Sequence, residues 1–501
     1  MDEYAGLILA GYFSILAVLC IFGAHRLILT RLFRKNVVWE PEPEQRFDDL
    51  PLVTLQIPVF NEKLVVERII DACAAIEYPR DKFQIQVVDD STDETRALAA
   101  AKCAEWAARG LDIEHIHRTN RVGFKAGGLD NAMRGAKGEL IAIFDADFLP
   151  PTDFLHRSIH FFADEAVGMV QTRWDHLNRD YSTLTQVQSI MLDAHFAIEH
   201  ATRSFSNLFF NFNGTAGIWR RATIDDAGGW HHDTLTEDLD LSYRAQLKGW
   251  RFRFLPNVVC PAELPIETSA FKSQQHRWAK GSIQVMLKSL GNIWRGKVPL
   301  AVKMEATFHL TGNLAYVLMM INTLFLVIPS MVVRGHWDWW QIILIDGPVF
   351  TLASLSFIWF YMASQRAVFG TAKGRRRYIP ALMSIGLGLG LNNTRAVLEA
   401  LAGQQSEFVR TPKTGSVGTN AVAPKKTYRL PKGGWGLFEF AIGLMYTAAI
   451  IWAITEGVWG SIPFLMLFQN GFLFIGGMTI WESWQQHRAR RSLAKELPAG
   501  T

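Results

Sequence analysis

The sequence has 501 residues, which is enough for two or three domains. Hydrophobic residues make up 49% and charged residues 20%, a balance typical of a chain with both soluble and membrane-embedded parts. A net charge of +4 is too small to indicate nucleic-acid binding. The four cysteines have no CxxC spacing, so a disulfide framework or a zinc site is not expected, and buried or incidental thiols are the better interpretation.

The N-terminal segment is predicted to be a membrane anchor. Residues 4–23 are almost all apolar and long enough to cross a bilayer. Asp2 and Glu3 precede the apolar stretch, and basic residues follow it from Arg26 onward. A secretory signal peptide has the opposite order of charges, so we expect an anchor whose N-terminus lies outside.

The region from about residue 50 to 290 has a different pattern. The apolar runs "LVTLQIPVF", "FQIQVVDD" and "LIAIFDAD" are rich in β-branched residues and are predicted to be strands. Between them, "EKLVVERIIDACAAI" and "ETRALAAAKCAEWAARG" have the apolar spacing of helices. This alternation predicts a parallel α/β sheet, which binds ligands at the carboxyl ends of its strands.

The C-terminal part of the chain is hydrophobic again. Four more spans are predicted at residues 310–333, 342–362, 437–454 and 462–480. Residues 379–401 have an amphipathic second half and basic flanks, so we expect them to be interfacial or re-entrant. Five spans in all place every strongly basic loop on one side of the membrane, as the positive-inside rule requires. A sixth span at 379–401 is the alternative, and it would leave one basic flank outside.

Two acids follow an apolar run in "IAIFDADFLP". Alternate residues of a strand face the same side, so Asp145 and Asp147 should project together. Their charges would repel each other unless a cation lay between them, and oxygen ligands favour Mg²⁺ or Mn²⁺ bridging to substrate phosphates. A pair of solvated acids near a turn is the alternative, and this motif alone does not decide between the two.

Three further stretches extend this pattern. "VVDDSTDET" ends an apolar run with Asp89 and Asp90, and "PVFNE" ends another with Glu62. "GFKAGGLDNAM" places Lys125 beside glycines and a helix start, which suits a phosphate, although it is not a Walker A sequence. Helix capping and an ordinary turn are the alternatives. Two acid-tipped strands in one sheet nevertheless favour a nucleotide site.

The stretch "TLTEDLDLSYRAQLKGWR" puts Thr236, Glu237 and Asp238 at the start of an amphipathic helix. Acids are favourable at a helix N-terminus, so capping alone could explain them. A carboxylate that faces a sugar hydroxyl is also a good general base. The motif therefore fits either a structural or a catalytic role.

The stretch "QQHRWAKGS" combines an amide, a guanidinium and an indole at Gln274, Arg277 and Trp278. An arginine can hold a diphosphate with two hydrogen bonds, and an indole face can pack against a sugar. The alternative is a basic, aromatic helix at the membrane interface.

Together these motifs resemble those of the family 2 inverting glycosyltransferases, and most closely the cellulose-synthase-like group. That family's pattern runs D, DxD, TED and QxxRW, and all four are present here in order. "KAGGLDNAM", "FNGTAGIWRR" and "AGGWHHDTLTEDLDLSYRA" are similar to the plant cellulose-synthase-like mannan and glucan-backbone enzymes. The resemblance covers roughly residues 50–415 and includes "SEFVRTPKTG", which is similar to the family's gating loop but carries an extra proline.

The resemblance implies a glycosyltransferase-A-like α/β domain and a role for each motif. Asp238, with Glu237 and Thr236 beside it, would deprotonate the acceptor hydroxyl as it attacks the anomeric carbon with inversion. Asp145 and Asp147 would hold Mg²⁺ or Mn²⁺ on the donor diphosphate. The other implied residues are Glu62, Asp89, Asp90, Lys125, Asp145 and Arg277 for the nucleotide sugar, Gln274 and Trp278 for the acceptor, and Phe408, Thr411 and Lys413 in the gating loop.

The resemblance also implies a processive enzyme that polymerises a β-linked glucan or mannan and exports it. The expected partners are UDP-glucose or GDP-mannose, the growing glycan and membrane lipids, whereas oligomeric state and accessory subunits stay open. One alternative is transfer of a single sugar to a lipid acceptor. Another is a nucleotide-sensing channel or transporter, against which Asp238 argues, because sensing needs no base.

The expected organisation alternates membrane and soluble parts. We place the catalytic domain on the cytoplasmic side, in what we expect to be a bacterial plasma membrane. The predicted parts are an anchor (1–35), a cytoplasmic glycosyltransferase domain (36–300), two spans (301–370), an interfacial helix with the gating-loop-like segment (371–433), two spans (434–485) and a basic tail (486–501).

Overall fold

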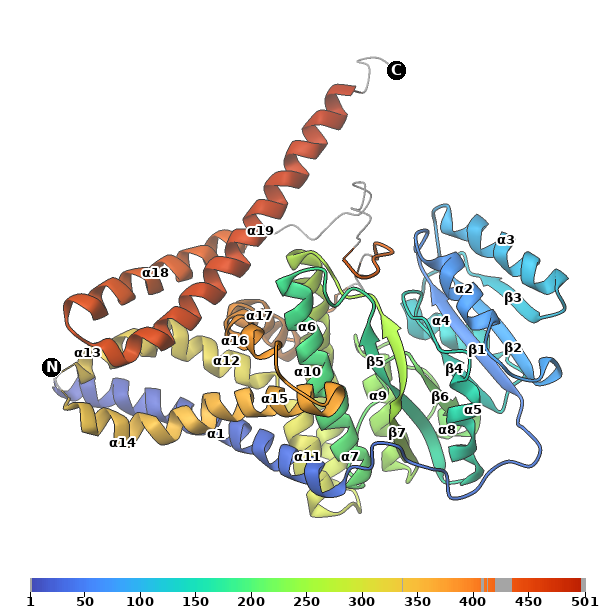
Figure 1. Cartoon of the computed structure of the whole chain (residues 1–501), viewed down its shortest axis with the longest axis horizontal. Helices are drawn as coiled ribbons and strands as arrows, with labels where there is room; N and C mark the ends of the chain where they lie inside the picture. Colours follow the sequence, from blue (N-terminus) through green and yellow to red (C-terminus); the bar gives the residue numbers. More distant parts are fainter. Residues whose placement is uncertain (1, 336, 407–409, 412, 420–434, 497–501) are drawn as a thin grey trace.

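The computed structural model describes residues 2–335, 337–406, 410–411, 413–419 and 435–496. Phe408, which we assigned to the gating loop, lies outside these residues. The α/β domain and the membrane-type helices form two adjoining parts, with α6 and α10 between them (Figure 1). This arrangement confirms the predicted fold class, an α/β domain inserted between membrane helices.

A seven-stranded sheet forms the centre of the α/β domain, in the order β3-β2-β1-β4-β6-β5-β7. The runs predicted to be strands from sequence are β1, β2 and β4. The strands are β1 (Val53–Val59), β2 (Phe83–Asp89), β3 (Asp112–His117), β4 (Leu140–Ile143), β5 (Val167–His176), β6 (Gly217–Arg220) and β7 (Arg251–Ala262).

The sequence analysis predicted a parallel sheet, and β6 departs from it by running antiparallel to both β4 and β5. The other neighbouring pairs are parallel. No apolar alternation marks β6 in the sequence, because its four residues sit in the middle of the sheet and three of them are buried. An antiparallel strand also needs no crossover helix, so β6 lacks the strand–helix rhythm that identified the others.

Helices cover both faces of the sheet (Figure 1). On one face, α2 (Val66–Ala74), α3 (Thr95–Ala108) and α5 (Phe154–Ser158) pack in one hydrophobic cluster with β1, β2 and β4. On the other face, α4 (Phe124–Met133) and α9 (Glu237–Leu247) pack in a second cluster with β4, β5 and β6. The alternate residues of β4 divide between the two clusters, so this strand is buried on both sides.

The two acids of "IAIFDADFLP" lie beyond the strand that precedes them. Strand β4 ends at Ile143, so Asp145 and Asp147 belong to the following loop and not to the strand end as predicted. The loop is fixed by a hydrogen bond from the Asp145 amide to Thr215 Oγ1 (2.8 Å) and by an antiparallel bridge between Phe148 and Ala262. These contacts end the pairing of β4 earlier than the apolar run suggests.

Five helical segments of the described chain are long and apolar enough to cross a membrane, which agrees with the predicted number. The first is α1 (Asp2–Asn36), the longest helix together with α19. The candidate spans are Tyr4–Asn36, Leu314–Arg334, Leu344–Phe369, Gly436–Thr455 and Trp459–Gln485. The second span runs from α12 (Leu314–Ile321) to α13 (Val327–Arg334), and the third from α14 (Trp339–Phe350) to α15 (Ser356–Phe369). The fourth is α18 (Gly436–Thr455), and the fifth lies mostly in α19 (Ile462–Glu496).

Residues 379–401 form two short helices, α16 (Ile379–Gly388) and α17 (Gly390–Leu401). Neither is among the candidate spans, because each is shorter than the ~20 residues that a crossing needs. Helix α16 packs against α19, and α17 packs against α12 and α10 (Thr268–Arg295). The remaining helices are α6 (Thr183–Ala194) with a π-helical turn (His195–His200), α7 (Ala201–Phe205), α8 (Arg221–Asp226) and α11 (Leu300–Thr311).

Candidate active site

A cavity lies where the carboxyl ends of β1, β2 and β4 meet helices α9 and α10. Such an edge is the usual ligand site of an α/β sheet. Most of the residues singled out in the sequence line this cavity. They are Glu62, Asp90, Lys125, Asp145, Asp147, Thr236, Glu237, Asp238, Gln274, Arg277, Trp278, Thr411 and Lys413.

Asp89 and Asp90 have different surroundings. Asp89 is fully buried and is not among the cavity-lining residues. It accepts a hydrogen bond from the Ser91 amide (2.7 Å) and pairs with Nε2 of His115 (2.9 Å). Burial raises the pKa of Asp89, but these hydrogen bonds outweigh it and hold the pKa below its ordinary value. Asp90 reaches the cavity and is held by the guanidinium of Arg118 (2.7 Å), so Asp90 alone of the two can contact a ligand there.

Lys125 and Asp145 form an ion pair in the cavity, with Nζ 2.5 Å from Oδ1. Lys125 Nζ also donates to the carbonyl oxygen of Gly214 (2.8 Å). Burial lowers the pKa of Lys125, whereas the nearby carboxylates of Asp145, Glu237 and Asp238 raise it. The carboxylates together outweigh burial, so the pKa lies above its ordinary value. The ammonium group therefore stays charged, as a contact to phosphate requires.

Gly214 brings two motifs together. A Cβ at this position would lie 3.1 Å from Oδ2 of Asp238 and 3.4 Å from Nζ of Lys125. Its φ of +79° is also a conformation that favours glycine. The loop "FNGTAG" therefore passes directly between the lysine and the predicted base, which the sequence alone did not reveal.

The backbone is strained at several points around the cavity. Asn61, Phe124 and Ala216 have φ angles of 55°, 49° and 54°, although none is glycine. Asn61 precedes Glu62, and Phe124 precedes Lys125. Ala216 follows Thr215, whose hydroxyl fixes the Asp145 loop. Such conformations cost about 1–3 kcal/mol and cluster at functional sites, so these three agree with the position of the cavity.

The segment after α17 lies across the cavity. Arg410 pairs with Glu62 (2.6 Å), and Lys413 pairs with Asp147 (2.6 Å). Glu263 anchors the end of the segment by accepting hydrogen bonds from the amides of Thr414 (2.6 Å) and Gly415 (2.9 Å). Burial raises the pKa of Glu62 to about 7, in spite of the opposing effect of Arg410.

Arg410 and Glu263 were missed in the sequence. Arg410 lies in the gating-loop-like stretch "SEFVRTPKTG" but was given no role there, and Glu263 belongs to none of the motifs described above. A basic residue two positions from Pro412 gave no signal by itself, since its partner Glu62 lies about 350 residues earlier in the chain. Thr411 is buried and lines the cavity. Its role in a gating loop stays a prediction.

Asp145 and Asp147 fit a divalent cation. Both line the same cavity, and each already holds a cation, the ammonium group of Lys125 or Lys413. A carboxylate pair with a displaceable lysine suits Mg²⁺ or Mn²⁺, which needs only one or two carboxylates because the substrate phosphates complete its shell. Of the two lysines, Lys413 comes from a segment outside the sheet, so it is the partner that a bound cation would displace.

The loop before α9 is held by helix α10. Leu235 N donates to Oε1 of Gln284 (2.9 Å), and a Cβ at Gly281 would come within 2.5 Å of Thr236 Cγ2, so α10 and Thr236 are in close contact. Thr236 occupies the position before the helix, yet its side chain makes no capping hydrogen bond. Capping by its side chain therefore does not explain this threonine.

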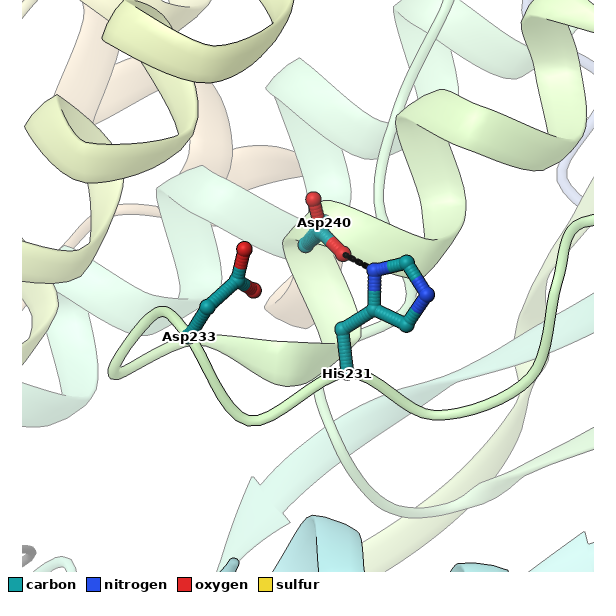
Figure 2. Close-up of side chains that lie close together, drawn as sticks. All are labelled: His231, Asp233 and Asp240. Carbon is teal, nitrogen blue, oxygen red and sulfur yellow. Dashed lines mark ion pairs between the residues drawn. The ribbon is translucent and has the colours of Figure 1, made fainter.

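A charged cluster lies one turn further along the same two helices. Figure 2 shows His231 and Asp233 from the loop and Asp240 from α9, with Nδ1 of His231 3.7 Å from the Asp240 carboxylate. These side chains could in principle hold a metal ion, and they are the one such group of three in the described part of the chain. Lys288 of α10 already occupies the cluster, 2.8 Å from Asp233 and 2.9 Å from Asp240. Lys288 of α10 thus joins the loop before α9 to α9 itself through these two ion pairs.

Asp238 lines the cavity and is partly buried. Burial and the neighbouring Glu237 carboxylate raise its pKa well above 3.8, against the lowering effect of Lys125 and Arg277. The amide of Leu239 donates to its Oδ1 (2.8 Å), and Ser242 donates to its carbonyl oxygen (2.6 Å). A fixed carboxylate with a raised pKa is the form of group that general-base catalysis needs near neutral pH.

Residues 51–281 match the family model described as "Glycosyltransferase like family 2". These residues are a family 2 glycosyltransferase domain. They include the whole sheet and the motifs from Glu62 to Trp278. The family resemblance indicated by the motifs is thus confirmed.

Two plant proteins are similar to this chain. Glucomannan 4-beta-mannosyltransferase 2 of Arabidopsis thaliana is 41% identical over 283 residues, which is 54% of this chain and 53% of the plant protein. Glucomannan 4-beta-mannosyltransferase 1 of rice (Oryza sativa subsp. japonica) is 41% identical over 272 residues, or 53% and 52% of the two chains. The chain thus spans about half the length of the curated relatives it matches.

Among solved structures, the chain resembles a mannosyltransferase from Pyrobaculum calidifontis determined with GDP-mannose and Mn²⁺. The sequence identity is 22% and the TM-score is 0.48, over 74% of this chain and 99% of the other. This similarity is too distant to support any conclusion about ligands.

Proposed function

We propose that the protein is an inverting mannosyltransferase that extends a β-1,4-linked mannan or glucomannan from GDP-mannose. One observation carries the proposal: Lys125, the Asp145–Asp147 pair, Asp238 and Arg277 all line a single cavity of a family 2 domain. The names of the plant relatives favour mannose over glucose as the transferred sugar. UDP-glucose is the alternative donor.

The chemistry follows from the position of each group. Asp238 accepts the proton of the acceptor's 4-hydroxyl as that oxygen attacks the anomeric carbon of the donor. The bond from this carbon to the phosphate oxygen breaks at the same time, and GDP leaves with the electron pair. Attack from the face opposite the leaving group turns the α-linked donor into a β-linked product.

The growing charge on the leaving diphosphate is stabilised by fixed cations. Arg277 and Lys125 face the cavity and can contact phosphate oxygens, which is electrostatic catalysis. A divalent cation held by Asp145 and Asp147 would add Lewis-acid stabilisation of the same charge. Lys413, which pairs with Asp147 in this structure, would give up that contact to such a cation.

The position of the acceptor residues favours a polymer over a single transfer. Gln274 and Trp278 line the cavity from α10, and α10 packs against α11, α17 and α19. An acceptor sugar stacked on Trp278 would therefore lie beside the membrane helices, where a growing chain can leave. We place the α/β domain on the cytoplasmic side and the N-terminus outside. Transfer of one sugar to a lipid is the second candidate, since a lipid acceptor could also reach this end of the cavity.

The Asp238→Asn variant tests the proposed base. Asparagine has nearly the same size but cannot accept the proton, so transfer should fall by about 10²–10⁴-fold, while GDP-mannose binding should persist. Both are measured on the purified full chain in lipid, by GDP release and by equilibrium binding. Full activity in this variant would refute the assignment, and Asp225→Asn on the exposed face of α8 is a matched control.

A further inference from the structure

A second cavity lies at the end of α1, away from the active site. Its walls come from one stretch of α1 and from Trp359 of α15. The lining residues are Leu27, Thr30, Arg31, Arg34, Lys35 and Trp359. Neither the family 2 domain, which begins at residue 51, nor any motif described above includes them.

Three cations of this cavity lack an acidic partner. Arg31, Arg34 and Lys35 are exposed, and within the described residues no carboxylate lies within 4.0 Å of their charged groups. Arg26, on the same helix, instead pairs with Glu199 of the π-helical turn. Arg31 and Lys35 are four residues apart, a spacing at which like charges destabilise a helix. An anion in the cavity would relieve this repulsion.

Trp359 gives the cavity an apolar wall. The guanidinium carbon of Arg34 lies 5.2 Å from the centre of its ring, and the tryptophan is still 46% exposed. Thr30, which also lines the cavity, is almost fully buried, and its hydroxyl donates to the Arg26 carbonyl oxygen (2.8 Å). A ligand here would therefore meet charge on one side and an apolar face on the other.

The cavity lies beyond the apolar part of α1, where lipid headgroups are expected. The candidate span in α1 has 33 residues, while ~20 are enough to cross the hydrocarbon. Its apolar part ends near Gly23, so at a rise of ~1.5 Å per residue Leu27 to Arg34 lie roughly 6–17 Å beyond that point. Tryptophan and arginine side by side are typical of this boundary.

A simple membrane anchor would explain part of this pattern. Basic residues are favourable in the last turn of a helix, which accounts for Arg34 and Lys35. The last turn does not account for Arg31, more than one turn earlier, or for a cavity that has Trp359 of another helix in its wall. Basic pockets between membrane helices commonly bind anionic lipid headgroups.

We propose that this cavity binds the headgroup phosphate of an anionic phospholipid. Arg31, Arg34 and Lys35 contact the phosphate, and the acyl chains extend past Leu27 and Trp359 into the bilayer. Because the ligand touches both α1 and α15, it should stabilise the packing of these two helices. The proposal does not depend on the proposed mannosyltransferase activity.

The test measures thermal stability of the full chain in detergent micelles. Added dioleoylphosphatidylglycerol should raise the melting temperature, whereas dioleoylphosphatidylcholine and inorganic phosphate should have little effect. The triple variant Arg31→Gln/Arg34→Gln/Lys35→Gln should lose most of the shift. An equal shift with inorganic phosphate would show an anion site without lipid specificity and would overturn the proposal.

A matched variant controls for net charge. Arg96→Gln/Arg134→Gln/Lys137→Gln removes three exposed cations from the surface of the sheet domain and should keep the full shift. If both triple variants lose the shift equally, the effect is general charge and the proposal is wrong. If the first triple variant does not purify as a folded protein, Trp359→Leu provides the second measurement. A full phosphatidylglycerol shift in that variant would also contradict the lipid site.

Discussion

The carboxyl group of Asp238 determines how activity should depend on pH. Its pKa is raised by burial and by Glu237, and only the deprotonated form can accept the acceptor's proton. We therefore expect kcat/KM to rise with pH through the raised pKa and to be lost as pH falls below it. The measurement is the pH profile of GDP release at fixed ionic strength. A rate that stays constant down to pH 5 would contradict a base with a raised pKa.

Gly214 is predicted to tolerate no side chain. Alanine would have to adopt a φ of +79° and place its Cβ 3.1 Å from the Asp238 carboxylate. We expect Gly214→Ala to cost about 1–3 kcal/mol of stability and to lower transfer strongly. Gly110→Ala, with a φ of +84° and an open surrounding, is the control that carries the backbone cost without the clash. Equal losses of activity in both variants would argue against a specific role for the loop.

The residues that the sequence revealed are those whose type is unusual for their place. Acids after an apolar strand identified Asp145 and Asp147, and both line the cavity even though they lie in a loop rather than on the strand. Asp89 and Asp90 could not be distinguished, since their roles depend on His115 and Arg118 from other elements. Such contacts between distant parts of the chain leave no local pattern.

At the scale of elements, helix α10 connects the proposed acceptor site to the proposed base, Asp238. Gln274, Arg277 and Trp278 of its first half line the cavity, and Gln284 and Lys288 of its second half hold the loop before α9. Arg277 and Trp278 follow Gln274 by three and four residues, Gln284 follows Arg277 by seven, and Lys288 follows Gln284 by four. These spacings place the five side chains on one face of the helix. Movement of α10 would therefore shift Asp238 and the acceptor together.

Replacing the contacts from α10 should affect the rate more than binding. We expect Gln284→Ala and Lys288→Met each to lower kcat by about tenfold, because the first removes the acceptor of the Leu235 amide and the second removes the ion pairs to Asp233 and Asp240. Donor affinity should change little, and Lys288→Arg should restore part of the rate. Steady-state kinetics separate the two effects, with Arg295→Met on the exposed end of α10 as control. A raised KM with unchanged kcat would show that these residues do not position the base.

The elements themselves were predictable to different degrees. Strands β1, β2 and β4 and the spans stood out because their apolar runs are long and bounded by polar turns. The antiparallel strand β6 has four residues and no such boundary, and so it could not be recognised. The break between α16 and α17 falls at Leu389, between Gly388 and Gly390, and the two helices pack against different partners on either side of it.

At the scale of the whole molecule, the α/β domain rests on the membrane helices through α10. The buried ion pair between Lys272 of α10 and Glu439 of α18 (2.6 Å) joins the two parts. Glu482 of α19 accepts hydrogen bonds from the amides of Thr268 (2.7 Å) and Ser269 (2.9 Å) and so caps the N-terminus of α10. The helix that carries the acceptor residues is thus fixed directly to the last two membrane helices. This arrangement suits a product that leaves through the membrane part.

The most direct test of the account is the product made by the purified full chain in lipid vesicles. With radiolabelled GDP-mannose and Mg²⁺ or Mn²⁺, we predict a long polymer that β-mannanase degrades, and no product once EDTA removes the cation. UDP-glucose, supplied alone in a parallel reaction, should give much less. A single labelled glycolipid, or a polymer made only from UDP-glucose, would contradict the proposed mannan synthase.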